Sequence, residues 1–393
     1  MLSCQKENQH PIFEIVDKNH TLLNKVLEEA EKYEVQIIYT QVHRDQKGDP
    51  KFRSLSYNYD SLKYFYPAST VKMPVAFLAL EKVNELNEVH GLDLDENTTI
   101  HHEASRHPQS AAITDSTHHS FKPTIGHYID KLFVVSDNDA YNRLYEFLGQ
   151  DYINDKLKEK GIFTDSRIVH RVGIGGFSTE DHKYTNAIKF VTETDEELLS
   201  LPPQKAEKNH FNTLEKTQKG KGYVDTSGQT IMEPFDMSKK NFINLKDLER
   251  SLVRFVFPDV YSEKERYQLT PEQYDRVRES MLYLPRDFEY LEQDTSYDYY
   301  DGYVKFFMYG DTKEDIPDHV KIMNKVGFAY GYLTDCAYIQ DLENDIEFFL
   351  TATIHVNENQ IYNDGVYEYD DIGIPFLAEL GRQVYWYELN REN

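Results

Sequence analysis

The sequence predicts an α+β fold in which one antiparallel β-sheet, built from both ends of the chain, is flanked by helices. Three observations support this. Strand patterns occur near the N-terminus, at 35–44 and 52–60, and again near the C-terminus, at 321–341 and 347–356. Segments with helical periodicity lie between and after them. We therefore expect residues 12–393 to form a single domain.

The N-terminal half is expected to alternate between helices and a hairpin. A helix at 20–33 precedes the two strands, and Gly48-Asp49-Pro50 forms the turn between them. An apolar helix begins near residue 70, and a polar, histidine-rich connection follows at 101–120. The helical stretch at 124–149 ends at Gly149 and is interrupted at Ser136-Asp137-Asn138.

The C-terminal half contains an insertion and the remaining strands. Residues 191–319 are polar and rich in tyrosine, and we interpret them as an inserted, mostly helical region with a helix at 270–284. Three antiparallel strands and a helical tail from Ile374, which carries Trp386, close the chain. This divides the domain into an α/β part (12–66 and 320–393), a helical part (67–190) and the inserted region (191–319).

Composition excludes several classes of protein. The chain has 393 residues, of which 39% are hydrophobic, so it can bury a sizeable core. A formal net charge of −25 argues against a nucleic-acid partner, because phosphates would be repelled. Only two cysteines occur, Cys4 and Cys336, which excludes a disulfide framework and a multi-cysteine zinc site. Cys336 lies in an expected strand and is predicted to be a buried core residue.

The N-terminus suggests attachment to a membrane. Met1-Leu2-Ser3-Cys4 resembles the end of a bacterial lipoprotein signal, and polar residues follow it as a tether over 1–11. The apolar segment that normally precedes such a cysteine is missing, so the match is either the remnant of a trimmed signal or accidental. If Cys4 is lipidated, the protein is a periplasmic or outer-surface lipoprotein of the bacterial cell envelope.

Three motifs point to acyl transfer. Ser69 and Lys72 form S-x-x-K at the start of the apolar helix, Ser136 belongs to Ser-Asp-Asn, and Lys325 begins Lys-Val-Gly on an expected strand. Taken singly, each motif is better explained as a solvated lysine, a helix cap and a strand end. In this order and at this spacing they indicate one catalytic site.

Each residue type has a role in such chemistry. Ser69 is the expected nucleophile, and Lys72 takes its proton if burial and a nearby cation, Lys325, lower the pKa of Lys72. Ser136 is expected to relay the proton to the leaving group, and Asn138 to bind a substrate amide and orient Lys72.

The transition state also requires donors for the oxyanion. The backbone N–H groups of Ser69 and Phe328 are the candidates, and Gly327 allows the substrate to approach the strand. These roles are all filled by protein groups, so we expect no cofactor and no metal.

These motifs resemble those of class A β-lactamases and penicillin-binding proteins, a superfamily of serine hydrolases. The run SDNDAYN at 136–142 is similar to the family's SDNxAxN, and residues 325–337 resemble its paired strands. The likeness covers about 15–190 and 320–390. It implies the family fold, an antiparallel sheet flanked by helices plus an all-helical subdomain that holds Ser-Asp-Asn, with the active site between them.

The sequence departs from that family at three points. Val326 replaces the residue whose hydroxyl binds a substrate carboxylate. The family's Ω-loop glutamate has no counterpart at the right spacing, and Glu180 is the nearest candidate for a deacylation base, although a solvated loop carboxylate is the simpler interpretation. The span from Ser-Asp-Asn to Lys-Val-Gly is far longer than in compact β-lactamases.

Two further clusters favour structural explanations. The polar connection contains five histidines that could gather as metal ligands: His101, His102, His107, His118 and His119. Adjacent pairs of histidines in such a loop usually face solvent, however. The insertion contains a run of four tyrosines: Tyr297, Tyr299, Tyr300 and Tyr303. They could form a binding surface for a peptide or carbohydrate, but they are expected to pack against the host domain.

The leading hypothesis is an envelope serine hydrolase that forms an acyl-enzyme on Ser69 with a small-molecule or peptide substrate, an amide or ester such as a cell-wall peptide. One alternative is a working class A β-lactamase with an unusual deacylating residue. Another is a non-catalytic binding protein that retains the pocket. An intact set of Ser69, Lys72, Ser136 and Lys325 argues against pure binding.

Overall fold

The computed structural model describes residues 10–17, 19–288, 291 and 298–391. Cys4, most of the expected tether at 1–11, and Tyr297 lie outside these residues. No helix in the described ranges combines the length and the apolar character that a membrane crossing requires.

The predicted sheet is confirmed. Its five antiparallel strands follow the order β10-β11-β12-β1-β2, so the N-terminal hairpin pairs with the C-terminal strands through β1 and β12, with Gln36 opposite Thr353. The strands are β1 Gln36–Arg44, β2 Pro50–Tyr57, β10 Val320–Ala329, β11 Tyr332–Asp341 and β12 Ile346–His355. β10 is an edge strand, which leaves one side of its backbone available to other partners.

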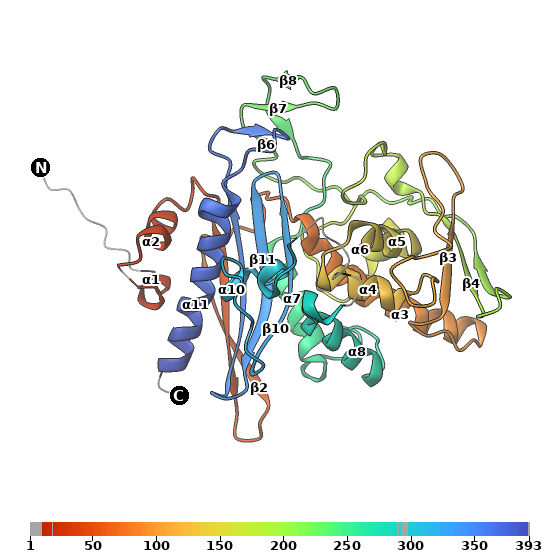
Figure 1. Cartoon of the computed structure of the whole chain (residues 1–393), viewed down its shortest axis with the longest axis horizontal. Coiled ribbons are helices and arrows are strands. Elements are labelled where there is room, and N and C mark those ends of the chain that lie inside the picture. The colour runs from red at the N-terminus through yellow and green to blue at the C-terminus, as the bar shows by residue number, and fades with distance from the viewer. Residues whose placement is uncertain (1–9, 18, 289–290, 292–297, 392–393) are drawn as a thin grey trace, which may run out of the picture.

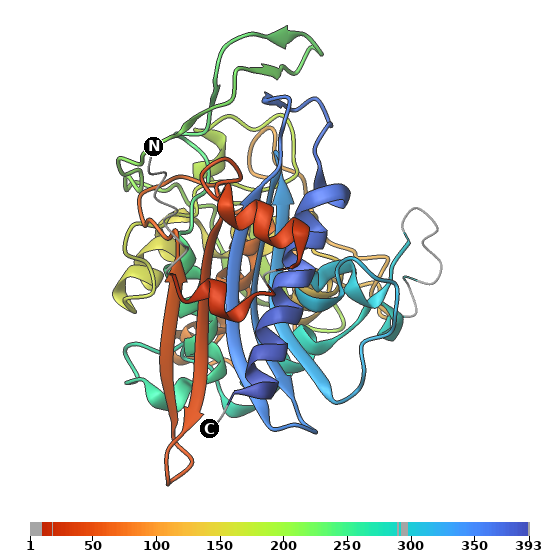
Figure 2. The ribbon, with the colours of Figure 1, turned by 90° about the vertical axis from the view of Figure 1, so that its left-hand side faces the viewer.

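Helices cover both faces of this sheet (Figures 1 and 2). In β12, Phe348 and Leu350 belong to the hydrophobic cluster beneath the C-terminal helix, whereas Phe349 between them belongs to the cluster on the opposite face. This alternation follows from the two-residue period of a strand. The first face is covered by α1 Ile12–Ile15, α2 Thr21–Glu28 and α11 Ile374–Asn390, and the second by α7 Leu245–Val256 and α8 Pro271–Leu282.

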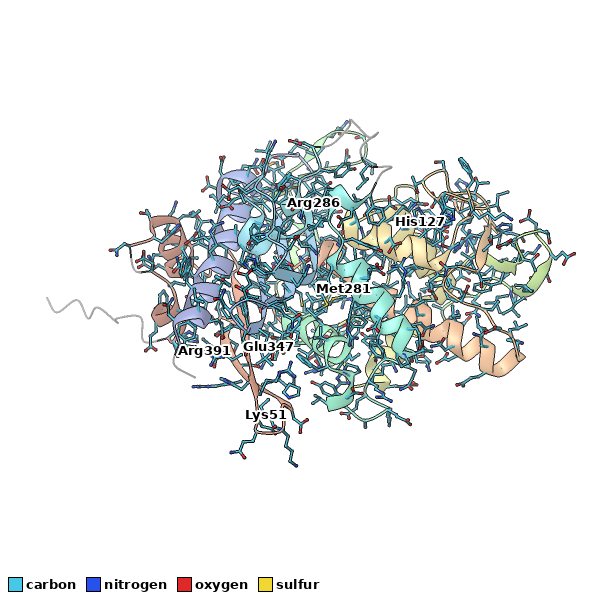
Figure 3. All side chains as sticks on the ribbon, turned by 60° about the horizontal axis from the view of Figure 1, so that its bottom comes forward. Lys51, His127, Met281, Arg286, Glu347 and Arg391 are labelled. Carbon is cyan, nitrogen blue, oxygen red and sulfur yellow. The ribbon has the colours of Figure 1, made fainter. Side chains whose placement is uncertain are left out.

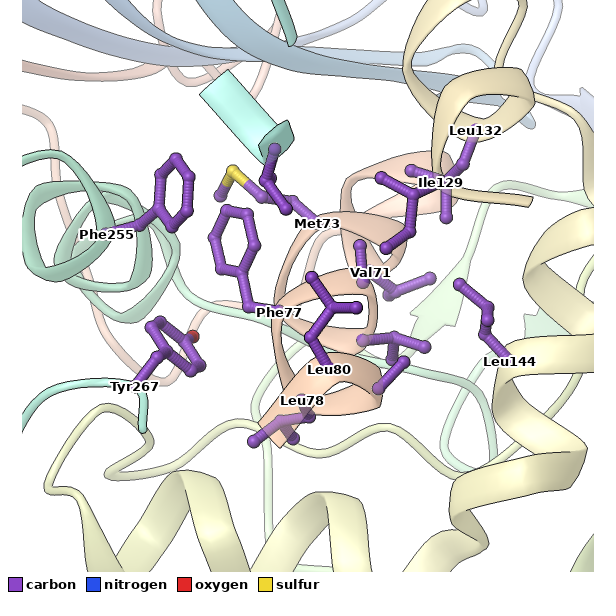
Figure 4. Close-up of a cluster of buried hydrophobic side chains, with 14 of the residues drawn as sticks. Val71, Met73, Phe77, Leu78, Leu80, Ile129, Leu132, Leu144, Phe255 and Tyr267 are labelled. Carbon is purple, nitrogen blue, oxygen red and sulfur yellow. The ribbon is translucent and has the colours of Figure 1, made fainter. Parts of the chain in front are cut away.

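The helical part is organised around α3 (Lys72–His90), which is buried from Lys72 to Val83. Figure 4 shows how its side chains pack on all sides, with Phe77 stacked on Phe255 at 4.1 Å between ring centroids and Tyr267 against its edge at 5.0 Å. The surrounding elements are α4 Ile125–Val134, α5 Asn138–Leu148, α6 Gln150–Glu159, β3 Thr99–Glu103 and β4 Ala187–Val191.

The expectation of a mostly helical insertion is wrong for 197–236. This stretch forms short strands instead, and β7 pairs in parallel with β13, with Gly222 opposite Ile361. Such pairings depend on a distant segment and leave no local periodicity to detect. The strands are β5 Glu197–Leu201, β6 Gln218–Lys219, β7 Gly222–Val224, β8 Thr230–Ile231, β9 Phe235–Asp236 and β13 Ile361–Tyr362. β7 and β8 project beyond the main sheet (Figure 1).

The described part of the remaining insertion contains the helices α7, α8 and α10 (Phe306–Tyr309), joined by turns and irregular segments. α8 coincides with the helix expected at 270–284 and begins with a capping box between Thr270 and Gln273. The short helix α10 leads from the insertion back into the sheet.

The stack of Phe77 on Phe255 predicts a large effect of truncation. Phe77→Ala should lower the free energy of unfolding by about 3–5 kcal/mol, because it leaves a cavity in a fully buried cluster. Urea unfolding followed by circular dichroism measures this. Phe121→Ala is the matched control, since that ring is 64% exposed and should cost little. Equal losses for the two variants would contradict the packing described.

Candidate active site

Ser69, the predicted nucleophile, lies on a strained turn at the start of α3. The 3-10 turn Ala68–Val71 leads directly into the helix, and Thr70 Oγ1 donates to the carbonyl oxygen of Pro67 at 2.7 Å. Ala68 has a φ of 46°, a left-handed conformation that costs a non-glycine residue free energy. The turn presents Ser69 to a cavity, while Lys72 lies one turn further in and is fully buried.

Strand β10 packs directly against this turn. A Cβ atom on Gly327 would lie 2.7 Å from the backbone nitrogen of Ser69 and 2.6 Å from the oxygen of Pro67. No larger residue fits between strand and turn without displacing backbone. The absence of a side chain at Gly327 therefore brings the edge strand, including Phe328, next to the nucleophile.

Ser136 occupies the predicted break between α4 and α5. It has a φ of 57°, and the next residue, Asp137, caps α5 by accepting a hydrogen bond from the backbone nitrogen of Ala140 at 2.7 Å. This local geometry turns Ser136 toward α3, and Asn138 begins α5 beside it.

Lys72 is bound by the Ser-Asp-Asn segment. Its Nζ donates to Asn138 Oδ1 at 2.7 Å, to Ser136 Oγ at 3.2 Å and to the carbonyl oxygen of Ser136. Burial lowers the pKa of Lys72 to about 7, and the charge of Asp137 opposes this shift. A substantial fraction of Lys72 is therefore neutral near pH 7 and able to accept a proton.

Lys325 approaches the same hydroxyl from the sheet. Its Nζ donates to Ser136 Oγ at 2.8 Å and to the carbonyl oxygen of Val326 at 2.9 Å. Burial and the nearby Lys72 hold the pKa of Lys325 well below the usual value for lysine. Ser136 thus connects the two lysines, and both cannot be charged without strong repulsion.

The four predicted catalytic residues converge at a cavity of about 500 Å³ between the sheet and the helical part. Ser69, Ser136, Asn138 and Phe328 line it, and Lys72 and Lys325 lie directly behind Ser136. Its other lining residues are Tyr66, Ala68, Val135, Asp137, Val172, Gly173, Tyr299, Tyr303, Val304, Val326, Ala329 and Tyr330.

A protein-family model matches the N-terminal half of the chain. Residues 20–221, which make up more than half of the chain, match the model of the β-lactamase enzyme family. The chain belongs to this family. No curated protein matches it.

Solved structures of β-lactamases share the fold. A variant of the class A β-lactamase of the last common ancestor of Gram-negative bacteria is 13% identical, with a TM-score of 0.51 over 95% of this chain and 99% of that one. The chromosome-encoded β-lactamase of Vibrio parahaemolyticus is 11% identical, with a TM-score of 0.50 over 95% and 100%. The class A enzyme of Clostridium kluyveri is 12% identical, with a TM-score of 0.50 over 92% and 97%.

This member of the β-lactamase family has an apolar wall beside Asn138, formed by Val172 and Gly173. Asn142 fixes that segment, donating to the oxygen of Val172 at 3.0 Å and accepting from its nitrogen at 2.9 Å. A Cβ on Gly173, whose φ is 59°, would lie 2.2 Å from Asn138 Nδ2. The loop therefore closes tightly on Asn138 and brings no carboxylate there.

Glu180 does not line this cavity. It is exposed and pairs with Lys183 at 2.8 Å and Lys205 at 3.4 Å. These lysines lower the pKa of its carboxyl. Its position favours the interpretation of a solvated loop carboxylate over a deacylation base. Among the described lining residues, Asp137 is the one carboxylate, and it caps α5.

A buried polar network behind β10 was missed by the sequence reasoning. Lys305 Nζ donates to Asn324 Oδ1 at 2.9 Å, Asn324 Nδ2 donates to Asp335 Oδ1 at 2.8 Å, and Asp335 Oδ2 accepts from the nitrogen of Phe307 at 3.2 Å. Burial lowers the pKa of Lys305 to about 8 and raises that of Asp335 to about 6. The isolated charge in the apolar run YVKFFM at 303–308 is the signal that could have revealed it.

This network also ties the insertion to the site. Lys305 donates to the carbonyl oxygen of Met281 at 2.7 Å and to that of Ile322 at 2.9 Å. Met281, on α8, lies between Glu347 of the sheet and His127 of the helical part (Figure 3). The insertion therefore supports the strand that carries Lys325.

The histidines form no metal site in the described part of the chain. The expectation that adjacent histidines face solvent is wrong for His102, which is fully buried in β3 with Nδ1 3.7 Å from Glu146 Oε2. Burial lowers its pKa well below that of a free histidine. Alternation along β3 turns one of two adjacent histidines inward.

The tyrosines of the insertion only partly follow the packing prediction. Tyr300 donates to the carbonyl oxygen of Gly310 at 3.0 Å, as a packing role requires. Tyr303 packs against the hydrophobic cluster beneath the C-terminal helix, as predicted, and it also lines the cavity together with Tyr299, which it meets in edge contact at 5.0 Å. Cys336 is buried, as predicted.

The contact of β10 with the nucleophile turn is testable. Gly327→Ala should slow the labelling of Ser69 by a fluorophosphonate by more than about tenfold, because the new methyl group displaces the strand or the turn. Gly175→Ala is the control, since a Cβ there meets nothing within 4 Å. Intact-mass kinetics measure both, and wild-type labelling of Gly327→Ala would refute the close approach.

Proposed function

We propose that this protein is a serine hydrolase that forms an acyl-enzyme on Ser69 with an amide or ester substrate of the bacterial cell envelope. The observation that carries the proposal is the hydroxyl of Ser136, which lies within hydrogen-bonding distance of both Lys72 and Lys325 at the cavity that Ser69 lines. Membership of the β-lactamase family supports the same reaction class.

In the proposed reaction, neutral Lys72 takes the proton of Ser69 as the serine Oγ attacks the substrate carbonyl carbon. The resulting oxyanion is held by the N–H groups of Ser69 and Phe328. Collapse of this intermediate breaks the bond to the leaving group, which receives the proton from Lys72 through Ser136. Water then hydrolyses the acyl ester, which releases the acid and restores Ser69.

The two lysines have different tasks in this scheme. Lys72 must be neutral before attack, and its burial favours that state because it lowers the pKa of Lys72 to about 7. Lys325 orients Ser136, and through it the path of the proton.

The apolar wall of Val172 and Gly173 bears on the second step. A base that activates water is needed to hydrolyse a penicilloyl ester rapidly, and the described wall provides none beside Asn138. We therefore favour a hydrolase or transpeptidase-like enzyme of the envelope, with a cell-wall peptide as a candidate substrate, over an efficient β-lactamase. The envelope location rests on the sequence around Cys4 alone.

Intact mass after incubation with a fluorophosphonate, and separately with a penicillin, tests this function. We expect a fluorophosphonate adduct that Ser69→Ala abolishes, and a penicilloyl adduct that persists for minutes to hours. Penicillin consumed without a lasting adduct would instead indicate a β-lactamase. If neither reagent forms an adduct and penicillin survives, the protein is a binding protein on this fold.

The acylation rate should depend on pH. Protonated Lys72 cannot accept the proton of Ser69, so the rate constant should rise about tenfold per pH unit below a pKa of about 7 and level off above it. Fluorophosphonate labelling between about pH 5 and 9 measures this profile. Lys72→Ala should be slow and lack the inflection; an unchanged inflection in that variant would assign it to another group.

A further inference from the structure

We propose that the substrate of this site is electrically neutral and carries an aromatic ring. The proposal rests on the function assigned to Ser69 and narrows its substrate class, since it favours a neutral aromatic amide or ester over an anionic cell-wall peptide. Three features of the cavity lead to it. Aromatic side chains lie on several sides of Ser69, no cationic side chain is present among the described lining residues to pair with an anionic substrate, and an exposed apolar ring lies beside the expected oxyanion position.

One aromatic surface is formed by Tyr66 and Tyr330. Tyr66 precedes the turn that carries Ser69, and Tyr330 follows the end of β10. Their rings meet edge to face at 5.0 Å, and Tyr66 lies parallel to His170 at 6.3 Å. Burial lowers the pKa of His170 to about 3, so this imidazole is neutral at physiological pH. The surface is thus aromatic and uncharged, and a ring can add to it in an edge or offset geometry.

A second aromatic surface comes from the insertion and β10. Tyr299 and Tyr303 meet edge to face at 5.0 Å, and Phe328 lies against Tyr369 at 5.6 Å. Phe328 is nevertheless 55% exposed, although large apolar side chains are normally covered. An apolar group of the substrate would cover this ring and gain the free energy of burying both surfaces.

The described lining residues offer no cation to an anionic substrate. Asp137 is the one charged side chain among its described lining residues, and it is negative. Lys325 is 1% exposed and directs its ammonium to Ser136 Oγ and to its neighbour's carbonyl oxygen. Lys240 is not among the described lining residues; its Nζ donates to the hydroxyl of Tyr330 at 3.4 Å and lies 5.1 Å from the centre of that ring.

Strand β10, which flanks the site, also offers no side-chain hydroxyl at position 326, because that residue is a valine. Val326 packs in the hydrophobic cluster of the sheet with 2% of its surface exposed, and it donates no hydrogen bond to a carboxylate. The net charge of −25 adds a long-range repulsion against anions. A carboxylate in this cavity would therefore lose its hydration without a charged partner in return, which is costly.

Binding to the full-length Ser69→Ala variant tests the proposal without any reaction. Phenylacetamide should bind at least about tenfold more tightly than acetamide, which lacks the ring, and than 4-carboxyphenylacetamide, which adds a carboxylate. Ligand-observed NMR titration gives the three dissociation constants. Comparable or tighter binding of either comparison ligand would overturn the proposal.

A matched pair of substitutions locates the preference. Phe328→Ser on the Ser69→Ala background should weaken phenylacetamide several-fold, whereas Phe121→Ser removes a ring of similar exposure (64%) outside the cavity and should change nothing. An equal affinity for phenylacetamide in the two variants would overturn the assignment of the ring to this cavity.

Turnover by the wild-type chain separates this proposal from the function on which it rests. Among p-nitrophenyl esters, the phenylacetate should show a kcat/KM at least about tenfold above those of the acetate and the 4-carboxyphenylacetate. If Ser69 reacts but the three esters are used equally, the hydrolase stands and the substrate class falls. If Ser69 is inert, the binding series still decides whether the cavity selects neutral aromatic ligands.

Discussion

The site depends on one interaction, the approach of two lysines to a single serine hydroxyl. Lys72 lies on a helix and Lys325 on the edge strand of the sheet. Ser136, whose backbone is in the left-handed conformation, lies between them. Both ammonium groups are buried. Burial lowers the pKa of Lys72 to about 7, and burial together with the nearby Lys72 holds the pKa of Lys325 well below the usual value for lysine. Any displacement of the three segments that carry these residues would weaken the coupling, because it falls with distance.

Much of the architecture can be understood as the means of holding these segments together. The edge strand β10 reaches the turn that carries Ser69 only because Gly327 has no side chain, and β10 is held in the sheet by its pairing with β11. Behind it, Lys305, Asn324 and Asp335 fix the strand from the opposite face and connect it to the insertion. Strain at Ala68 and Ser136 is offset by this surrounding packing.

The same scaffold combines a family reaction centre with an individual cavity. The residues of the three sequence motifs converge at one cavity, and other segments form its walls: an apolar loop at Val172 and Gly173, tyrosines from the insertion, and a valine on the flanking strand. Reaction class and substrate choice are thus carried by different parts of the chain. The first follows from short motifs, and the second from segments far from them in sequence.

The sequence by itself determined the α+β class, the sheet strands and the break at Ser136, because periodicity and short motifs are local signals. It also named the candidate reacting residues that the structure brings to one cavity. Only the tertiary structure decided that Glu180 lies away from the cavity, that His102 is buried, that 197–236 forms strands, and that Lys305 and Asp335 support Lys325. Each of these depends on contacts between segments tens to hundreds of residues apart, and burial of a charge or pairing of a short strand leaves no pattern in its own neighbourhood.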